Sequence, residues 1–151
     1  MCADSVATVG SAFTARQEIC EMGRRIYARA FVAANDGNIS ARLSADRILC
    51  TPTGVSKGFL TQDMLAICDM DGEQVSGPMK ISSEIRMHLE AYKLREDIAA
   101  VVHAHPPTAT GFAVALETKP FVQHGRLRDR RVVGRVESID AVPVILILHS
   151  Q

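Results

Sequence analysis

Two histidines separated by one residue, His103 and His105, are the side chains in this sequence best suited to hold a metal ion. They end the run AAVVHAH, which predicts a buried strand, and Pro106-Pro107 stops that strand at once. Residues two apart on a strand share a face, with α-carbons about 6–7 Å apart, so both imidazoles can reach one ion. Zinc suits such a site because it polarises a carbonyl without redox chemistry, and cobalt or iron can substitute. Taken alone, the pair is better explained as two polar residues at a strand end.

A carboxylate, Glu84, follows two serines at the predicted start of a helix. The backbone N–H groups and the dipole of a helix start stabilise an anion, so a glutamate there needs no chemical role. Ser82 and Ser83 are good N-cap residues, and their hydroxyls together with the unpaired N–H groups suit a substrate phosphate. This helix start is therefore a place where a site can be assembled.

Two dipeptides, Gly37-Asn38 and Thr53-Gly54, lie in turns beside predicted strands. Their glycines permit the backbone to approach an anion closely, although each dipeptide alone is simply a turn. The sequence contains neither GxxxxGK[ST] nor GxGxxG, which argues against a nucleotide-dependent kinase or dehydrogenase. His88, on the predicted helix after Glu84, is expected to be a packed or solvated side chain and not a ligand.

The spacing of apolar residues predicts the elements that must position these groups. Helices are expected at about 12–31, 84–95 and 108–116. Strands are expected at 38–43, 47–51, 65–70, 73–77 and 99–105. This order of helices and strands indicates an α/β fold in which helices cover a sheet.

Composition excludes several classes of partner. The 151 residues include 17 basic and 17 acidic side chains, so no overall field favours nucleic acid or an anionic membrane. The four cysteines are far apart and form no CxxC pair, which favours a reduced chain over a disulfide framework. With no leader-like start and no apolar run of spanning length, we expect a cytoplasmic protein.

Four motifs taken in order resemble the class II aldolase/adducin head domain: GNIS at 37–40, TPTG at 51–54, SSE at 82–84 and HAHP at 103–106. The similarity covers roughly Ala15 to Leu116 and is closest in appearance to L-fuculose-phosphate aldolase-like enzymes. It implies a three-layer αβα sandwich around a largely antiparallel sheet. It also implies a homo-oligomer, commonly a tetramer with active sites at subunit interfaces.

The resemblance further implies a role for each matching residue. His103 and His105 would bind zinc, and Glu84 would be the catalytic acid/base that also approaches the metal. The substrate phosphate would be bound by Gly37, Asn38, Thr53, Gly54, Ser82 and Ser83. The implied enzyme is a metal-dependent aldehyde-lyase that cleaves a phosphorylated ketose, such as L-fuculose 1-phosphate, to dihydroxyacetone phosphate and an aldehyde. Similar motifs occur in pentulose-phosphate epimerases and methylthioribulose-phosphate dehydratases, so the motifs identify the chemistry better than the substrate.

The C-terminal part departs from this pattern. We expect residues 1–121 to be the front part of an aldolase-like domain and 122–151 to be an atypical tail, because five arginines crowd into ten residues of QHGRLRDRRVVGR. The family's third zinc histidine would lie beyond this chain, and neither His124 nor His149 is expected to replace it. Our hypothesis is that the tail is a shifted reading frame, in which case its apolar run VPVILIL was never selected to fold. Translation of the coding DNA in the other reading frames tests this hypothesis. If no frame encodes a family-like continuation, the hypothesis is wrong.

Two other readings compete with a complete enzyme. One is a non-catalytic, adducin-like assembly domain, and the other is an inactive truncated fragment. The SSE motif and the histidine pair favour an enzyme, because a purely structural descendant has no physical need for them.

Overall fold

The computed structural model of the protein describes residues 6, 8–115 and 144–149. Its centre is a six-stranded sheet in the order β4-β3-β2-β1-β5-β6, and every neighbouring pair in it is antiparallel. The strands are β1 (Asn38–Ser44), β2 (Arg47–Cys50), β3 (Ala66–Cys68), β4 (Gln74–Ser76), β5 (Ile98–Ala104) and β6 (Val144–His149). The helices are α1 (Ala12–Ala28), α2 (Ile85–Leu94) and α3 (Pro107–Ala115), with 3-10 turns at Lys57–Phe59 and Gln62–Met64.

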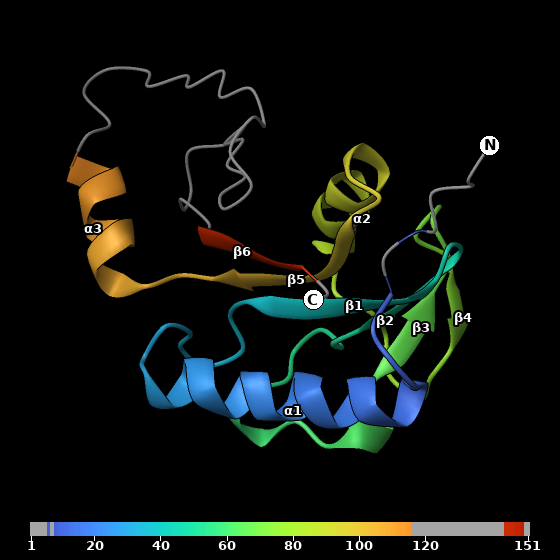
Figure 1. The fold of residues 1–151 in the computed structure, drawn as a ribbon. Coiled ribbons are helices and arrows are strands. Elements are labelled where there is room, and N and C mark those ends of the chain that lie inside the picture. The colour runs from blue at the N-terminus through green and yellow to red at the C-terminus, as the bar shows by residue number, and fades with distance from the viewer. Residues whose placement is uncertain (1–5, 7, 116–143, 150–151) are drawn as a thin grey trace.

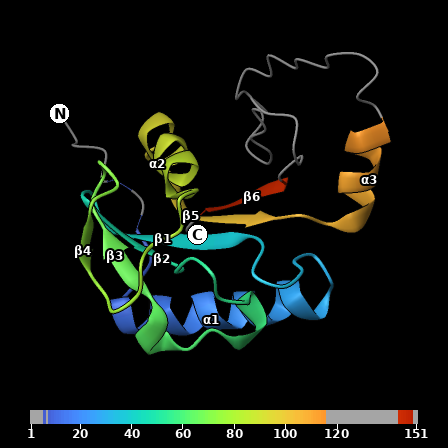
Figure 2. The ribbon, with the colours of Figure 1, turned by 180° about the vertical axis from the view of Figure 1, so that it is seen from behind.

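Helices α1 and α2 cover opposite faces of the sheet (Figures 1 and 2). The core is accordingly split into two apolar clusters. One joins the sheet to α1 through residues such as Ile19 and Ile39, and the other joins it to α2 through residues such as Ile48 and Leu89. The predicted αβα sandwich with an antiparallel sheet is therefore confirmed. No helix in the described part of the chain is long and apolar enough to cross a membrane.

Strand β1 is central, and its two faces differ in character. Ile39 and Ala41 belong to the apolar cluster under α1. The alternating residues Asn38, Ser40 and Arg42 are also buried, but they turn polar groups toward α2. Each of these side chains contacts α2 or its N-cap, Glu84. Among the described residues, Asn38 Oδ1 and Arg42 Nε have no hydrogen-bond partner.

Some predicted boundaries and one predicted cap need correction. The first helix ends at Ala28 instead of about Phe31, because Arg29 caps it and Ala30 turns left-handed with φ 55°. Neither Ser82 nor Ser83 is the N-cap of α2: Glu84 holds that position, and Ser82 Oγ accepts the Glu84 N–H at 3.3 Å. The strand expected through residue 105 ends at Ala104.

The apolar run near the C-terminus supplies β6, which pairs with β5 at the edge of the sheet. Cys20, Cys50 and Cys68 are buried free thiols.

Candidate active site

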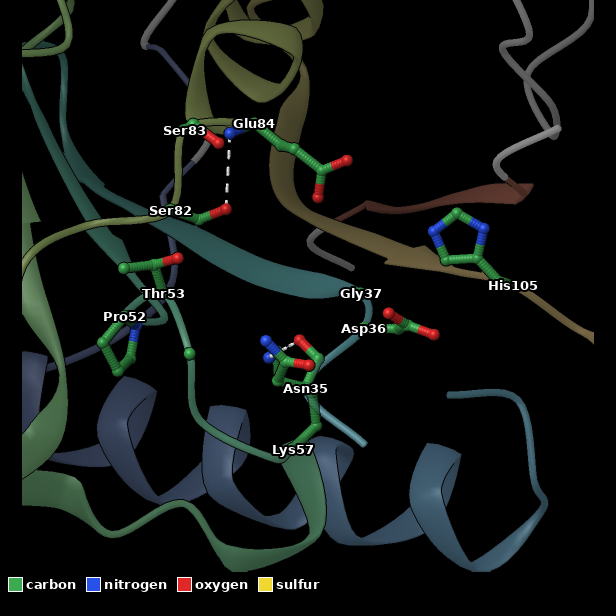
Figure 3. A pocket seen from close by; sticks show the side chains of 11 residues that line it. Asn35, Asp36, Gly37, Pro52, Thr53, Lys57, Ser82, Ser83, Glu84 and His105 are labelled. Atoms are coloured by element: carbon green, nitrogen blue, oxygen red, sulfur yellow. Dashed lines mark hydrogen bonds between the residues drawn. The ribbon is translucent and has the colours of Figure 1, made fainter. Parts of the chain in front are cut away.

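A polar pocket of about 250 Å³ opens where three loops meet beside the end of β5 (Figure 3). The loops are the turn before β1, the segment after β2 and the start of α2. The residues that line the pocket are Asn35, Asp36, Gly37, Pro52, Thr53, Gly54, Lys57, Ser82, Ser83, Glu84 and His105. Segments separated by up to 70 positions in the sequence thus meet at one rim of the sheet.

Glu84, Asn38 and His103 form a connected group at the inner end of this pocket. Asn38 lies opposite His103 in the β1–β5 pairing, which places both side chains on one face. The Asn38 amide nitrogen donates to Glu84 Oε2 and lies 3.2 Å from His103 Nδ1. Glu84 Oε2 is also 3.4 Å from His103 Nδ1. The Glu84 side chain is 48% exposed and the His103 side chain only 2%, so the carboxylate links the open pocket to a buried imidazole.

The surroundings of His103 favour its neutral form. Burial lowers its pKa, and the nearby Glu84 carboxylate only partly offsets that effect. A neutral imidazole is the form that binds a metal. His103 Nε2 is buried without a hydrogen-bond partner, so this nitrogen has no competing protein contact.

His105 lies just beyond β5 and lines the pocket. Its backbone N–H donates to the Phe31 carbonyl at 2.8 Å, which takes the chain away from the sheet. The rings of His103 and His105 nevertheless stand together, with centroids 4.6 Å apart and planes at 57°. The two histidines predicted as a metal pair are thus neighbours, although only His103 is on the strand.

The donor set suits zinc in type, since two imidazoles and one carboxylate lie close together. Among the described residues, however, no group of three or more His, Cys, Asp or Glu side chains is arranged to hold a metal ion. His149 lies opposite Ile98, whereas His103 lies opposite Ile145, so the strand register places His149 well along β5 from the pocket. His124 lies outside the described residues. The described site therefore offers two imidazoles, His103 and His105, and no third histidine.

Five of the six residues predicted to bind phosphate line the pocket: Gly37, Thr53, Gly54, Ser82 and Ser83. Both glycines have φ near +72°, where only glycine is free of strain. At Gly37 a Cβ would also lie 2.7 Å from the His103 carbonyl oxygen, so this turn packs directly on the strand that carries the histidines. Asn38 is not part of the pocket lining, because it points to Glu84 and His103 instead.

Lys57 is a pocket residue that sequence reasoning missed. Its side chain is buried, and Nζ donates to the carbonyl oxygens of Asn35 at 3.0 Å and Val55 at 2.6 Å. Burial lowers the pKa of Lys57, while Asp36 and Glu84 act to raise it. Lys57 is the one lysine or arginine among the residues that line the pocket. Its only signal in the sequence is its place just after TPTG, and nothing local predicts that a lysine there is buried.

His88 is a packed side chain and not a solvated one. Its Nδ1 lies 2.7 Å from Ser40 Oγ, on the polar face of β1. Burial, with a smaller contribution from His103, lowers the pKa of His88 to about 3, so it is neutral across the usual pH range.

Comparison with known proteins agrees with this geometry. The family model described as Class II Aldolase and Adducin N-terminal domain matches residues 17–144. L-fuculose phosphate aldolase of Methanococcus maripaludis is 40% identical over 102 residues, which are 68% of this chain and 54% of that protein. Methylthioribulose-1-phosphate dehydratase of Granulibacter bethesdensis is 38% identical over 97 residues, which are 64% of this chain and 45% of that protein.

Solved structures show the same fold. YgbL from Klebsiella pneumoniae superposes with a TM-score of 0.65 at 28% identity, over 70% of this chain and 50% of that one. L-fuculose-1-phosphate aldolase from Thermus thermophilus superposes with a TM-score of 0.55 at 31% identity, over 69% of this chain and 50% of that one. This chain therefore spans about half the length of the relatives it matches. On the family match and on the four motifs gathered at one rim of the sheet, the chain belongs to the class II aldolase and adducin N-terminal domain family.

Proposed function

We propose that this chain carries an aldolase-type lyase site that cleaves a phosphorylated ketose similar to L-fuculose 1-phosphate. The products would be dihydroxyacetone phosphate and an aldehyde. The observation that carries the proposal is that the Glu84 carboxylate lines a polar pocket and contacts His103, whose ring stands beside that of His105. Relatives named as aldolases, dehydratases and a decarboxylase of phosphorylated compounds support a phosphorylated sugar or sugar acid as the substrate class.

The pocket supports phosphate binding by its chemistry. Ser82, Ser83 and Thr53 bring hydroxyl groups, and the turns at Gly37 and Gly54 bring the backbone close without side chains in the way. Lys57 adds a buried positive charge that is worth more there than in bulk water. In this proposal, a phosphate held by these groups orients the ketose with its carbonyl end toward Glu84 and the histidines.

In the proposal, His103 and His105 would hold a zinc ion, and Glu84 would approach it. The chemistry that zinc supplies when bound is polarisation of the substrate carbonyl and stabilisation of the negative charge left by carbon–carbon cleavage. Asn38 keeps the Glu84 carboxylate in place by donating to it. Because three protein ligands are usual for catalytic zinc, we expect two imidazoles to bind it only weakly.

Glu84 is the proton-transfer group. Its half-exposed carboxylate faces the pocket from a fixed position at the start of α2. When the carbon–carbon bond breaks, the bonding electron pair stays with the half that carries the phosphate. The hydroxyl group on the other carbon of that bond loses its proton and becomes the aldehyde. In this proposal the Glu84 carboxylate takes up that proton and delivers it to the carbon of the phosphate-bearing half, which yields dihydroxyacetone phosphate.

The test is cleavage of L-fuculose 1-phosphate by the purified chain with added zinc, with dihydroxyacetone phosphate as the measured product. Zinc content is determined in parallel. Glu84→Gln keeps the size and the amide contact of the side chain but cannot transfer the proton, so activity should fall while zinc content stays. His103→Ala should lose both. Absence of cleavage with zinc bound in wild type would rule out this reaction for the isolated chain.

Dehydration is a second candidate, because a methylthioribulose-1-phosphate dehydratase is nearly as similar to this chain as the aldolase is. Removal of a proton next to a carbonyl needs the same carboxylate. Loss of water from a pentulose phosphate, seen by mass spectrometry, separates dehydration from epimerisation, which leaves the mass unchanged.

We also propose a cytoplasmic homo-oligomer, a tetramer by analogy with the family. Large aromatic side chains on the α1 side are exposed, including Phe13 at 64% and Phe59 at 68%, and burial between subunits would remove them from water. Light scattering of the purified chain measures the subunit number. Assembly without any lyase activity would instead favour the adducin-like reading.

A further inference from the structure

We propose that His88 and Ser40 are positioning residues that fix the place of Glu84 along β1. This inference rests on the proposed role of Glu84 as the proton-transfer group. Neither residue lines the pocket, so any effect that they have on the reaction is indirect.

The argument begins with matched spacing between α2 and β1. Glu84, His88 and Tyr92 are four residues apart, a step of about 6 Å along a helix. Asn38, Ser40 and Arg42 are two residues apart, a step of about 6.6 Å along a strand. Successive members of the two sets can therefore pair as α2 runs over the sheet.

The contacts follow this spacing. Glu84 receives the Asn38 amide at the start of both elements. One helix turn later, His88 Nδ1 lies 2.7 Å from Ser40 Oγ, and Tyr92 Oη lies 2.8 Å from the same hydroxyl. At the far end, Arg42 Nη2 donates to the Tyr92 carbonyl at 2.7 Å.

All of the groups behind Glu84 are withdrawn from water. Ser40 is 0% exposed, and His88 and Tyr92 are each 1% exposed. Water therefore cannot replace a lost partner, and a shift of α2 by one residue would leave several of these atoms unpaired. Apolar side chains would fill the same layer but would tolerate small sliding, whereas these polar contacts form in one alignment only.

That alignment matters because it sets the position of Glu84, which lies at the solvent-exposed end of this series of contacts. The Glu84 side chain is half exposed, and its described side-chain contacts are with Asn38 and His103. The buried His88–Ser40 contact is the next polar contact between α2 and β1, one turn further along the helix. A displacement of about 1 Å at a reacting group can cost about 100-fold in rate.

The test compares His88→Leu with His88→Asn. Leucine removes the contact to Ser40, whereas the asparagine amide can place a polar atom near the former Nδ1. We expect kcat for ketose phosphate cleavage to fall about 10- to 100-fold in His88→Leu with little change in KM, and to recover in large part in His88→Asn. Ile48→Val, in the same core layer but without polar contacts, is the control for lost packing and should keep kcat.

A second readout does not depend on activity. The NMR signals of the Asn38 side-chain amide report its hydrogen bond to Glu84. They should shift in His88→Leu and in Ser40→Ala, return toward wild type in His88→Asn, and stay in place in Ile48→Val. Ser40→Ala changes the volume least, so it decides the matter if His88→Leu does not fold.

An unchanged kcat and unchanged Asn38 signals in His88→Leu or Ser40→Ala overturn the proposal. So does an asparagine variant as impaired as the leucine variant. If zinc-loaded wild type cleaves no ketose phosphate while the Asn38 signals respond as expected, the proposed function fails and the positioning role stands.

Discussion

Asn38 on β1 lies directly opposite His103 on β5, and its amide nitrogen is 3.2 Å from His103 Nδ1 while it also donates to Glu84. One side chain thus links the proposed metal ligand to the proposed proton-transfer group. A partner that orients a metal-binding histidine is commonly worth about 10- to 100-fold in metal affinity. Asn38→Ala should therefore weaken zinc binding by that factor, measured by competition with a chelator.

Asn35→Ala is the matched control for that change. Asn35 lines the pocket, but its described contact is made by the backbone carbonyl, which alanine keeps. Equal losses of zinc affinity in both variants would show that Asn38 has no specific effect on zinc binding.

Lys57→Met should weaken the binding of inorganic phosphate to the metal-free chain. A hydrogen bond to a charged group contributes about 1.5–3 kcal/mol, so a loss of roughly tenfold or more in affinity is expected by calorimetry. Arg16→Met is the control, because Arg16 also donates to two loop carbonyls, those of Gln62 and Leu65, but does not line the pocket. Both variants should have a lower free energy of unfolding, and only Lys57→Met should bind phosphate more weakly.

The two left-handed glycines of the pocket should respond differently to alanine. At Gly54 a Cβ would meet nothing within 4 Å, so Gly54→Ala should cost only the conformational strain, about 1–2 kcal/mol. At Gly37 a Cβ would lie 2.7 Å from both the His103 carbonyl oxygen and Val32 Cγ1, so Gly37→Ala adds a steric clash to the same strain. Urea unfolding of the two variants measures the difference. Equal losses of unfolding free energy would mean that the turn at Gly37 moves freely away from His103.

Stability should depend on pH through His88. Burial lowers the pKa of His88 to about 3 from its ordinary value of 6.5, so the unfolded chain binds this proton more readily than the folded one. Above pH 6.5 the contribution of His88 to the free energy of unfolding does not change with pH. As the pH falls from 6.5 toward 3, this contribution lowers the free energy of unfolding by up to about 1.4 kcal/mol per pH unit. Urea unfolding at several pH values in wild type and His88→Asn isolates this slope. Identical slopes in the two proteins would show that His88 is solvated.

The sequence alone predicted the class of fold and more than half of the residues that line the pocket. Local patterns carry that information. Alternation predicted a strand over residues 38–43, the prolines predicted the end of a strand beside His103 and His105, and the four family motifs implied the αβα sandwich. Five of the six residues assigned to phosphate binding do line one pocket. Residue type and short-range spacing are enough to predict these features, because they determine which functional groups each segment carries and which secondary structure it favours.

Only the tertiary structure decided how those residues pair. The amide of Asn38 faces Glu84 and His103 instead of the pocket because β1 lies between β2 and β5 and turns that face toward α2. The burial of Lys57 and the neutral state of His88 also depend on layers that meet only in the folded chain. Burial and cross-strand register are set by contacts between segments distant in the sequence, and no local pattern encodes them.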